Sequence, residues 1–117
     1  MSHRISFKVA FSGLKYAFLT QPNFRVHSLI AALVLTTAVI LKLSRLEWLV
    51  LLVAVTLVLI AEMINTSLEA ATDLLAPEYQ SQAKIAKDVA AGMVLLAAIF
   101  SVIIGLVIFI PHLWPSF

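Results

Sequence analysis

Four polar residues that could carry out acid–base or metal chemistry share one stretch of an otherwise apolar sequence. Glu62, Asn65, Glu69 and Asp73 follow one another at intervals of three and four residues. At 100° per residue of an α-helix, all four lie within about 80° of one another on one face. The spacing therefore predicts a membrane helix that carries a polar stripe toward one of its ends.

An acidic stripe on a membrane helix needs a compensating partner. A charged side chain inside a span costs at least about 2.5 kcal/mol on insertion scales, and carboxylates that share a face also repel one another. A cation, a proton or a basic partner would offset this cost. The functional interpretation is a metal and phosphate site in which a carboxylate acts as a general base. Two alternatives stay open: the stripe pairs with another helix, or the helix simply leaves the membrane.

A second polar cluster stands at the start of the last apolar segment. It consists of Lys87 and Asp88 in the run Ala-Lys-Asp. Lysine binds phosphate as a point charge, and Asp88 could orient Lys87 or a sugar hydroxyl. Alternatively, Lys87 extends from the span to the interface. His27 is expected to be a packing or interface residue, and His3 and His112 are expected to have no role.

The composition indicates that a lipid bilayer surrounds these residues. Of the 117 residues, 62% are apolar and 12% are charged, whereas an average soluble domain has about 45–50% and about 25%. Stretches with few charges predict three spans, at about 25–43, 46–67 and 88–110, each near the about 20 residues that a span needs. Pro111 and then Pro115 are expected to end the last helix.

The short connection at Ser44-Arg45 predicts that the first two spans form an antiparallel hairpin, and a polar connection at about 76–82 follows the second. The whole chain, 1–117, is expected to be one all-α membrane domain. Without cysteine, disulfides and thiolate zinc sites are excluded. The surplus of two basic residues does not suggest a nucleic-acid partner.

Residues 4–19 differ from the spans, because a basic face lies beside an apolar stripe made of Phe7, Phe11, Leu14 and Phe18. This pattern favours an amphipathic helix on the membrane surface over a frayed basic tail. Six Lys and Arg residues lie on the side of the N-terminus and the second connection, and two lie on the opposite side. The N-terminus and the polar stripe are therefore expected on the cytoplasmic side of the plasma (inner) membrane.

The polar stripe also carries a resemblance to a known family. The run from Glu62 to Asp73, followed by Ala-Lys-Asp at 86–88, resembles the signature of the prokaryotic diacylglycerol kinases, which include undecaprenol kinases. The resemblance implies a homotrimer of three-span subunits with sites between neighbours. It also implies a lipid kinase that uses ATP and Mg²⁺ to phosphorylate diacylglycerol or undecaprenol.

The resemblance implies roles for the stripe. Glu62 matches the family's catalytic base, which takes the proton from the lipid hydroxyl, and Asn65 matches an active-site residue near the transferred phosphate. Glu69 matches a ligand of the metal that accompanies ATP. A second acidic ligand usually precedes the first span, and the corresponding residue here is Gln21, whose side-chain oxygen carries no charge.

Residues outside the stripe complete the site that the resemblance implies. The positions that match nucleotide contacts are Glu78, Tyr79, Lys87 and Asp88. Phe24 and Arg25 belong to the stretch before the first span and are expected to contact the lipid. The run from Asn23 to His27 leans toward the members that prefer undecaprenol.

Two interpretations from other functional classes remain at this point. A small proton-coupled transporter would use Glu62 as its proton carrier within the membrane. A non-enzymatic scaffold subunit would use the stripe only for helix packing. The transporter does not explain why Glu69, Lys87 and Asp88 gather at the same interface, and the scaffold predicts that Glu62→Gln changes little beyond helix packing.

Overall fold

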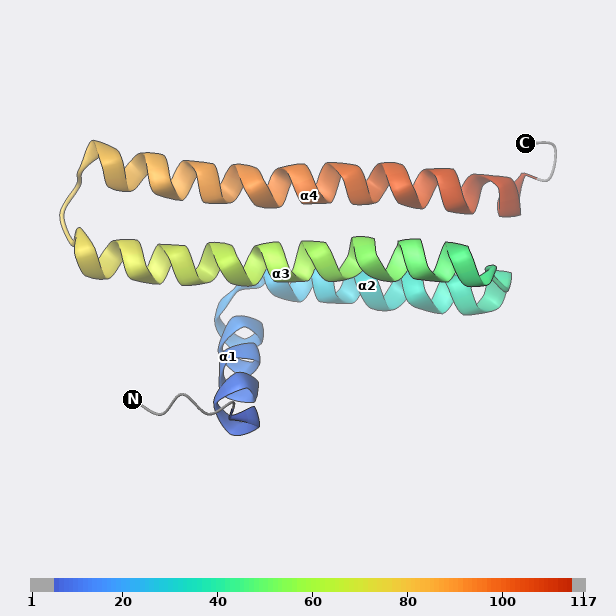
Figure 1. The fold of residues 1–117 in the computed structure, drawn as a ribbon, viewed down its shortest axis with the longest axis horizontal. Helices are drawn as coiled ribbons and strands as arrows, with labels where there is room; N and C mark the ends of the chain where they lie inside the picture. The colour runs from blue at the N-terminus through green and yellow to red at the C-terminus, as the bar shows by residue number, and fades with distance from the viewer. Residues whose placement is uncertain (1–5, 115–117) are drawn as a thin grey trace.

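A computed structural model of the chain describes residues 6–114, and this part consists of four helices joined by short connections (Figure 1). Their bounds are α1 Phe7–Thr20, α2 Pro22–Leu41, α3 Arg45–Leu75 and α4 Ser81–Leu113. The helices α2, α3 and α4 are each long and apolar enough to cross a membrane. This confirms the prediction of an all-helical chain with three spans.

The helices α3 and α4 extend beyond the predicted spans where they approach their connection. The helix α3 runs to Leu75, and α4 begins at Ser81. With 31 residues at 1.5 Å each, α3 is about 46 Å long, whereas a bilayer core is about 30 Å thick. The two helices therefore form a projecting pair at the end of the bundle where they connect. We call this end the site end and the opposite end the turn end.

The turn end is closed by a Schellman motif between α2 and α3. Lys42 adopts a left-handed conformation with φ of 54°, and its N–H donates to Val39 O. The N–H of Leu43 donates to Ala38 O, and both of these side chains are buried together. The motif satisfies carbonyl groups that a helix end leaves free, and it reverses the chain within three residues.

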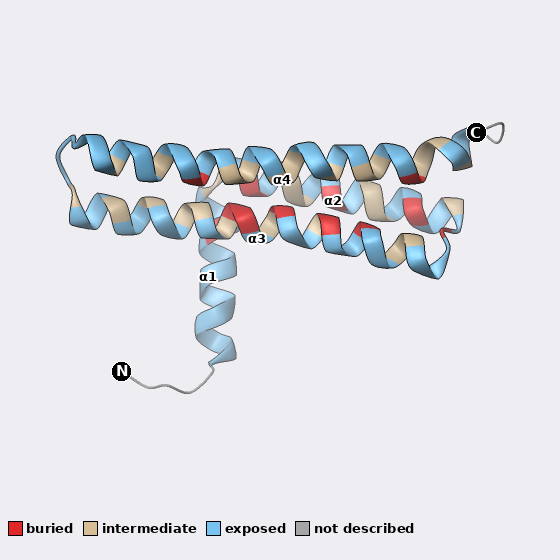
Figure 2. Cartoon of the chain, turned by 45° about the horizontal axis from the view of Figure 1, so that its top comes forward, coloured by how far each residue is buried: buried red, intermediate tan, exposed pale blue. Residues whose placement is uncertain are grey.

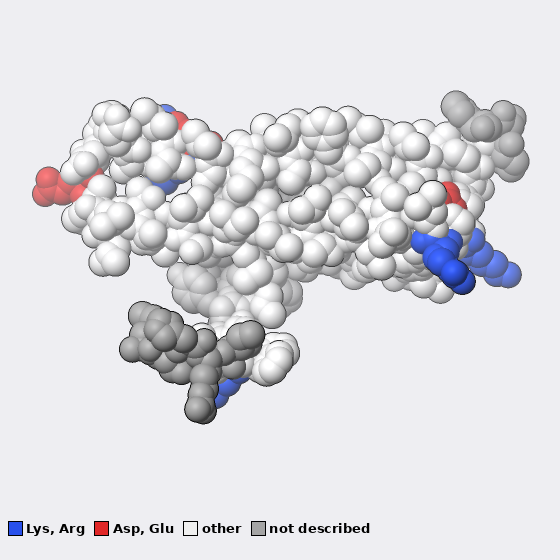
Figure 3. Space-filling model, viewed as in Figure 1, with Lys and Arg blue, Asp and Glu red and all other residues white. Residues whose placement is uncertain are grey.

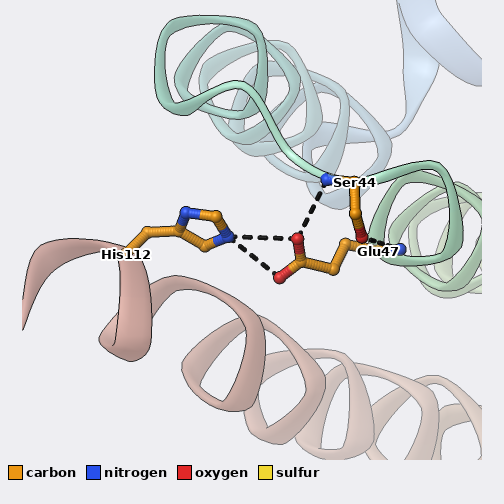
Figure 4. A network of polar contacts seen from close by, with 3 residues as sticks. All are labelled: Ser44, Glu47 and His112. Atoms are coloured by element: carbon orange, nitrogen blue, oxygen red, sulfur yellow. Dashed lines mark hydrogen bonds and ion pairs between the residues drawn. The ribbon is translucent and has the colours of Figure 1, made fainter. Parts of the chain in front are cut away.

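The start of α3 is fixed by a reciprocal cap that also reaches α4 (Figure 4). Ser44 Oγ accepts from the Glu47 N–H at 3.2 Å, and Glu47 Oε1 accepts from the Ser44 N–H at 2.9 Å. His112 Nε2 lies 2.9 Å from Glu47 Oε2. His112, expected to have no role, therefore ties the end of α4 to the start of α3.

The last helix does not stop at Pro111. It continues to Leu113 and includes the proline in its final turn, and the Trp114 N–H donates to Ile110 O. A proline in this position costs one backbone hydrogen bond of the helix. The expectation that Pro111 ends the helix was wrong by two residues. Pro115 lies outside the described residues.

The largest apolar cluster lies near the turn end, between α2, α3 and α4 (Figure 2). Its buried members are Ala38, Leu43, Leu51 and Ile108. Many other large apolar side chains of the three long helices are exposed. On the face seen in Figure 3, charged side chains gather toward the two ends of the bundle, and its middle shows none. This distribution suits a bundle whose middle faces lipid or other apolar surfaces.

The helix α1 projects sideways from the bundle (Figure 1). Its residues are exposed except Ala17, and the stripe of Phe7, Phe11, Leu14 and Phe18 has open access. Residues 4 and 5 of the predicted surface helix lie outside the described part. A hollow of about 280 Å³ lies between the second half of α1 and α3, where Gly13 and Ala17 face Met63 and Ala70.

Candidate active site

The most buried charged side chain lies in the polar stripe of α3. Glu62 is 2% exposed, and its carboxylate faces α2, where His27 Nε2 lies 3.2 Å from Glu62 Oε1. No described residue gives this oxygen an aligned hydrogen bond. A buried carboxylate with a free lone pair can accept a proton, which is the property that a general base needs.

His27 is the site residue that sequence reasoning missed, because it was expected to pack or to lie at an interface. The signal was present in the hairpin. His27 lies 15 residues before Lys42 and Glu62 lies 18 residues after Ser44, so antiparallel helices bring the two within about one helical turn of each other. A count outward from this turn would have made His27 a candidate neighbour of Glu62.

Asn65 and Glu69 continue the stripe by one and two helical turns. Asn65 Nδ2 donates to Glu69 Oε1 at 3.4 Å. The other amide atom, Asn65 Oδ1, is buried and receives no hydrogen bond within residues 6–114. The stripe thus offers a half-buried carboxylate beside an unsatisfied amide oxygen, two donors of the kind that a hard cation prefers.

These donors fit Mg²⁺ bound together with a nucleotide. Proteins usually hold Mg²⁺ through one or two carboxylates, while phosphate oxygens and water complete its shell. The described residues contain no cluster of three His, Asp or Glu side chains that could hold a metal. A site that phosphate oxygens and water complete needs only one or two ligands from the protein, and Glu69 with Asn65 Oδ1 could supply that number.

Lys87 and Asp88, the second polar cluster, do not pair with each other but with other residues. Lys87 forms an ion pair with Asp73 on α3, and Asp88 forms one with Lys84 one turn earlier on α4. Asp88 therefore orients Lys84 and does not orient Lys87, because neighbouring helical residues point in different directions. The contact of Lys87 with Asp73 places this lysine against the end of the polar stripe.

The connection at Gln21 and the first turn of α2 act mainly as a joint between α1 and α2. Arg25 Nη1 donates to Phe18 O and to Leu19 O, each at 3.0 Å, and so holds the end of α1 against α2. Phe24 is buried. Gln21 lies between the two helices and is half-buried, and its Nε2 donates to Thr20 Oγ1. These bonds fix the direction in which α1 leaves the bundle.

Glu78 and Tyr79 lie in the connection between α3 and α4, and both are exposed. The structure brings neither into contact with Glu62 or Asn65 within this chain. Their position at the tip of the projecting pair leaves both side chains free to meet a molecule from water.

An apolar groove of about 320 Å³ leads away from the site between α2, α3 and α4. His27 stands at one end of its lining, Val58 lies one turn from Glu62, and Gly105 comes from α4. Its volume is at the lower end of the range for ligand pockets, about 300–1,000 Å³. A buried acid–base pair thus adjoins an apolar channel.

Known proteins are similar in sequence to this chain along most of its length. The prokaryotic diacylglycerol kinase family model matches residues 8–109. A diacylglycerol kinase of Synechocystis is 46% identical over 110 residues, which are 93% of this chain and 63% of that protein. The undecaprenol kinase of Bacillus subtilis is 37% identical over 108 residues, 92% of this chain and 88% of that protein.

A diacylglycerol kinase of Escherichia coli K12 is 29% identical over 103 residues, which are 88% of this chain and 84% of that protein. The interpretation as a proton-coupled transporter gains no support from these matches. The matched stretch includes α2, α3 and most of α1 and α4, and therefore the whole polar stripe. The chain belongs to the prokaryotic diacylglycerol kinase family of membrane lipid kinases.

Proposed function

We propose that the chain transfers the γ-phosphate of ATP to the hydroxyl of a membrane lipid alcohol, either diacylglycerol or undecaprenol, with Glu62 as the base. The observation that carries this proposal is the buried Glu62 carboxylate, which adjoins an apolar groove on one side and the Asn65–Glu69 pair on the other. A hydroxyl on an apolar chain and a water-borne phosphate can therefore meet at one carboxylate.

In this reaction the lipid oxygen forms a bond to the γ-phosphorus, the bond from that phosphorus to ADP breaks, and the hydroxyl proton goes to Glu62. Asn65 lies near the transferred phosphate. Mg²⁺, bound by Glu69 with Asn65 Oδ1 or Gln21 as a neutral partner, would neutralise developing phosphate charge. Lys87, Asp88 and the exposed Glu78 and Tyr79 contact the nucleotide, with Lys87 held in place by Asp73.

The site end lies on the cytoplasmic side of the plasma (inner) membrane, where ATP is available. The excess of Lys and Arg on that side supports this orientation. The sideways direction of α1 and its exposed Phe7, Phe11 and Phe18 support a helix that lies in the membrane surface. Arg25 contacts the lipid headgroup beside this helix, and the buried Phe24 supports this part of α2 from within.

The chain works as a homotrimer. The large exposed apolar surface of the three long helices supports an assembly in which neighbouring chains cover these faces. In a single chain, Glu69 is half-buried and Asp73 is exposed, so this end of the stripe stays open.

The apolar groove holds one hydrocarbon chain of the lipid. We expect Gly105→Leu to raise the KM for lipid about 5- to 30-fold, because its isobutyl side chain would enter the groove, and an obstruction of this kind costs about 1–2 kcal/mol. A Cβ at Gly105 meets no atom within 4 Å, so the helix itself accepts the change. Steady-state kinetics at saturating ATP measure it.

The matched control is Gly92→Leu. Gly92 lies on the same helix, also has open space around its Cβ, and does not line the groove. An equal rise of KM in both variants would argue against a chain in the groove. A change of oligomeric state confined to Gly105→Leu would instead identify the occupant as a second copy of the chain.

The activity itself is tested with purified protein in mixed micelles that contain Mg²⁺ and ATP labelled at the γ-phosphate. Diacylglycerol and undecaprenol are offered separately, with Glu62→Gln as the blank. Label in one lipid well above the other, and lost in the blank, identifies the substrate. No label in either lipid would contradict the proposal.

A further inference from the structure

We propose that His27 is the proton acceptor for Glu62: it receives the proton that Glu62 takes from the lipid hydroxyl and releases it to water. The inference rests on the proposed role of Glu62 as base. It addresses the step that follows phosphoryl transfer, because a base must lose its proton before the next turnover.

Glu62 cannot return its proton to water directly, because its side chain is only 3% exposed. His27 Nε2 lies 3.2 Å from Glu62 Oε1, within the distance over which a proton can pass once the two groups align. The His27 side chain is 25% exposed. It therefore touches the buried carboxylate and also has access to the outside.

The other basic side chains at the site end of α2 and α4 have their own partners. Lys87 is paired with Asp73, and Lys84 is paired with Asp88. Arg25 donates to the end of α1 and, like arginine in general, does not give up its proton. Within the described residues, His27 is the basic group that the structure places against Glu62.

The charges of the pair permit this route. Before transfer, the pair consists of a carboxylate and a neutral imidazole and carries one negative charge. The lipid proton moves to the Glu62 carboxylate, which leaves two neutral groups, and then to His27 Nε2, which leaves a carboxylate beside an imidazolium. The attraction between these two charges and the partial exposure of His27 offset the cost of forming them. Water then takes the proton from the exposed imidazolium and restores the first state.

The test separates proton transfer from helix packing. His27→Gln can keep a nitrogen near Glu62 but cannot carry the proton, and we expect kcat to fall at least about tenfold with the KM for ATP unchanged. In His27→Ala, added imidazole is expected to restore part of the lost kcat, because it fits the space that the side chain leaves and supplies the missing acceptor.

The matched control is His112. It also pairs with a glutamate of α3, at 2.9 Å, and is 27% exposed, but it lies at the turn end. His112→Gln is expected to keep the wild-type kcat, and imidazole is expected to have no effect on His112→Ala. Size-exclusion chromatography and circular dichroism verify that all four variants assemble and stay helical.

Wild-type kcat in His27→Gln would overturn the inference, and so would a loss in His27→Ala that imidazole does not restore. Glu62→Gln is measured in parallel. If Glu62→Gln is inactive while His27→Gln is normal, only the inference about His27 fails. If Glu62→Gln retains wild-type activity, the assignment of the base fails, and the inference fails with it.

Discussion

Replacing Glu62 with Gln is expected to lower kcat by about 10²- to 10⁴-fold, the range that general base catalysis usually contributes. Glutamine keeps the shape of the side chain but cannot accept the lipid proton. It also removes a buried charge, so the helix packing of α3 against α2 is expected to persist. The rate of γ-phosphate transfer to lipid, measured at saturating ATP, is the direct readout.

Glu47→Gln is the matched control for this change. Glu47 lies on the same helix and also contacts a histidine, but it does so at the turn end. A Gln side chain can still accept the Ser44 N–H, so the cap of α3 is retained. Similar rates for Glu62→Gln and the wild type would favour the scaffold interpretation, in which the stripe serves only packing.

The second large effect is expected at the metal. Replacing Glu69 with Ala should raise the Mg²⁺ concentration for half-maximal rate about 10- to 100-fold, the range reported for losing a group that supports a metal site. The variant removes a carboxylate and also leaves Asn65 Nδ2 without its partner. Titration of the rate with free Mg²⁺ at fixed ATP measures the shift.

Glu69→Gln separates charge from shape in that experiment. Its amide oxygen can still accept from Asn65 Nδ2, so the local hydrogen bond remains while the negative charge is lost. A Mg²⁺ requirement that rises in both variants supports a ligand role. If the Mg²⁺ requirement rises in Glu69→Ala alone, the role of Glu69 is to hold the Asn65 side chain in place. If the Mg²⁺ titration is unchanged in both variants, Glu69 is not part of the metal site.

The sequence predicts those parts of the fold that depend on one helix at a time. Gaps between charged residues predict three long apolar helices, and the short connection at Ser44 predicts the tight hairpin. Where α3 ends is harder to predict. The segment after Asn65 is polar enough to leave a membrane, but it keeps its helical hydrogen bonds through Leu75. Hydropathy indicates where a helix leaves the membrane, but it does not indicate where the helix ends.

Contacts between helices depend on register and rotation, which periodicity alone does not give. The face shared by Glu62 and Glu69 follows from their spacing, because one helix determines it. The partner of Glu62 on α2 and the contact of His112 with Glu47 depend on how far each helix slides along its neighbour. The bond from Lys87 to Asp73 likewise depends on the length of the connection between α3 and α4.

The unequal closure of the two ends of the bundle has a mechanical consequence. The turn end is fastened by the Schellman motif, the reciprocal cap and the largest apolar cluster. Glu62 lies about 27 Å along α3 from Ser44 at 1.5 Å per residue, so a tilt of about 3° about that end moves it by about 1.4 Å. The long helices can therefore tilt as rigid bodies about a fixed hinge at the turn end. A tilt of this size away from α2 would lengthen the 3.2 Å separation of His27 Nε2 and Glu62 Oε1 beyond hydrogen-bond distance.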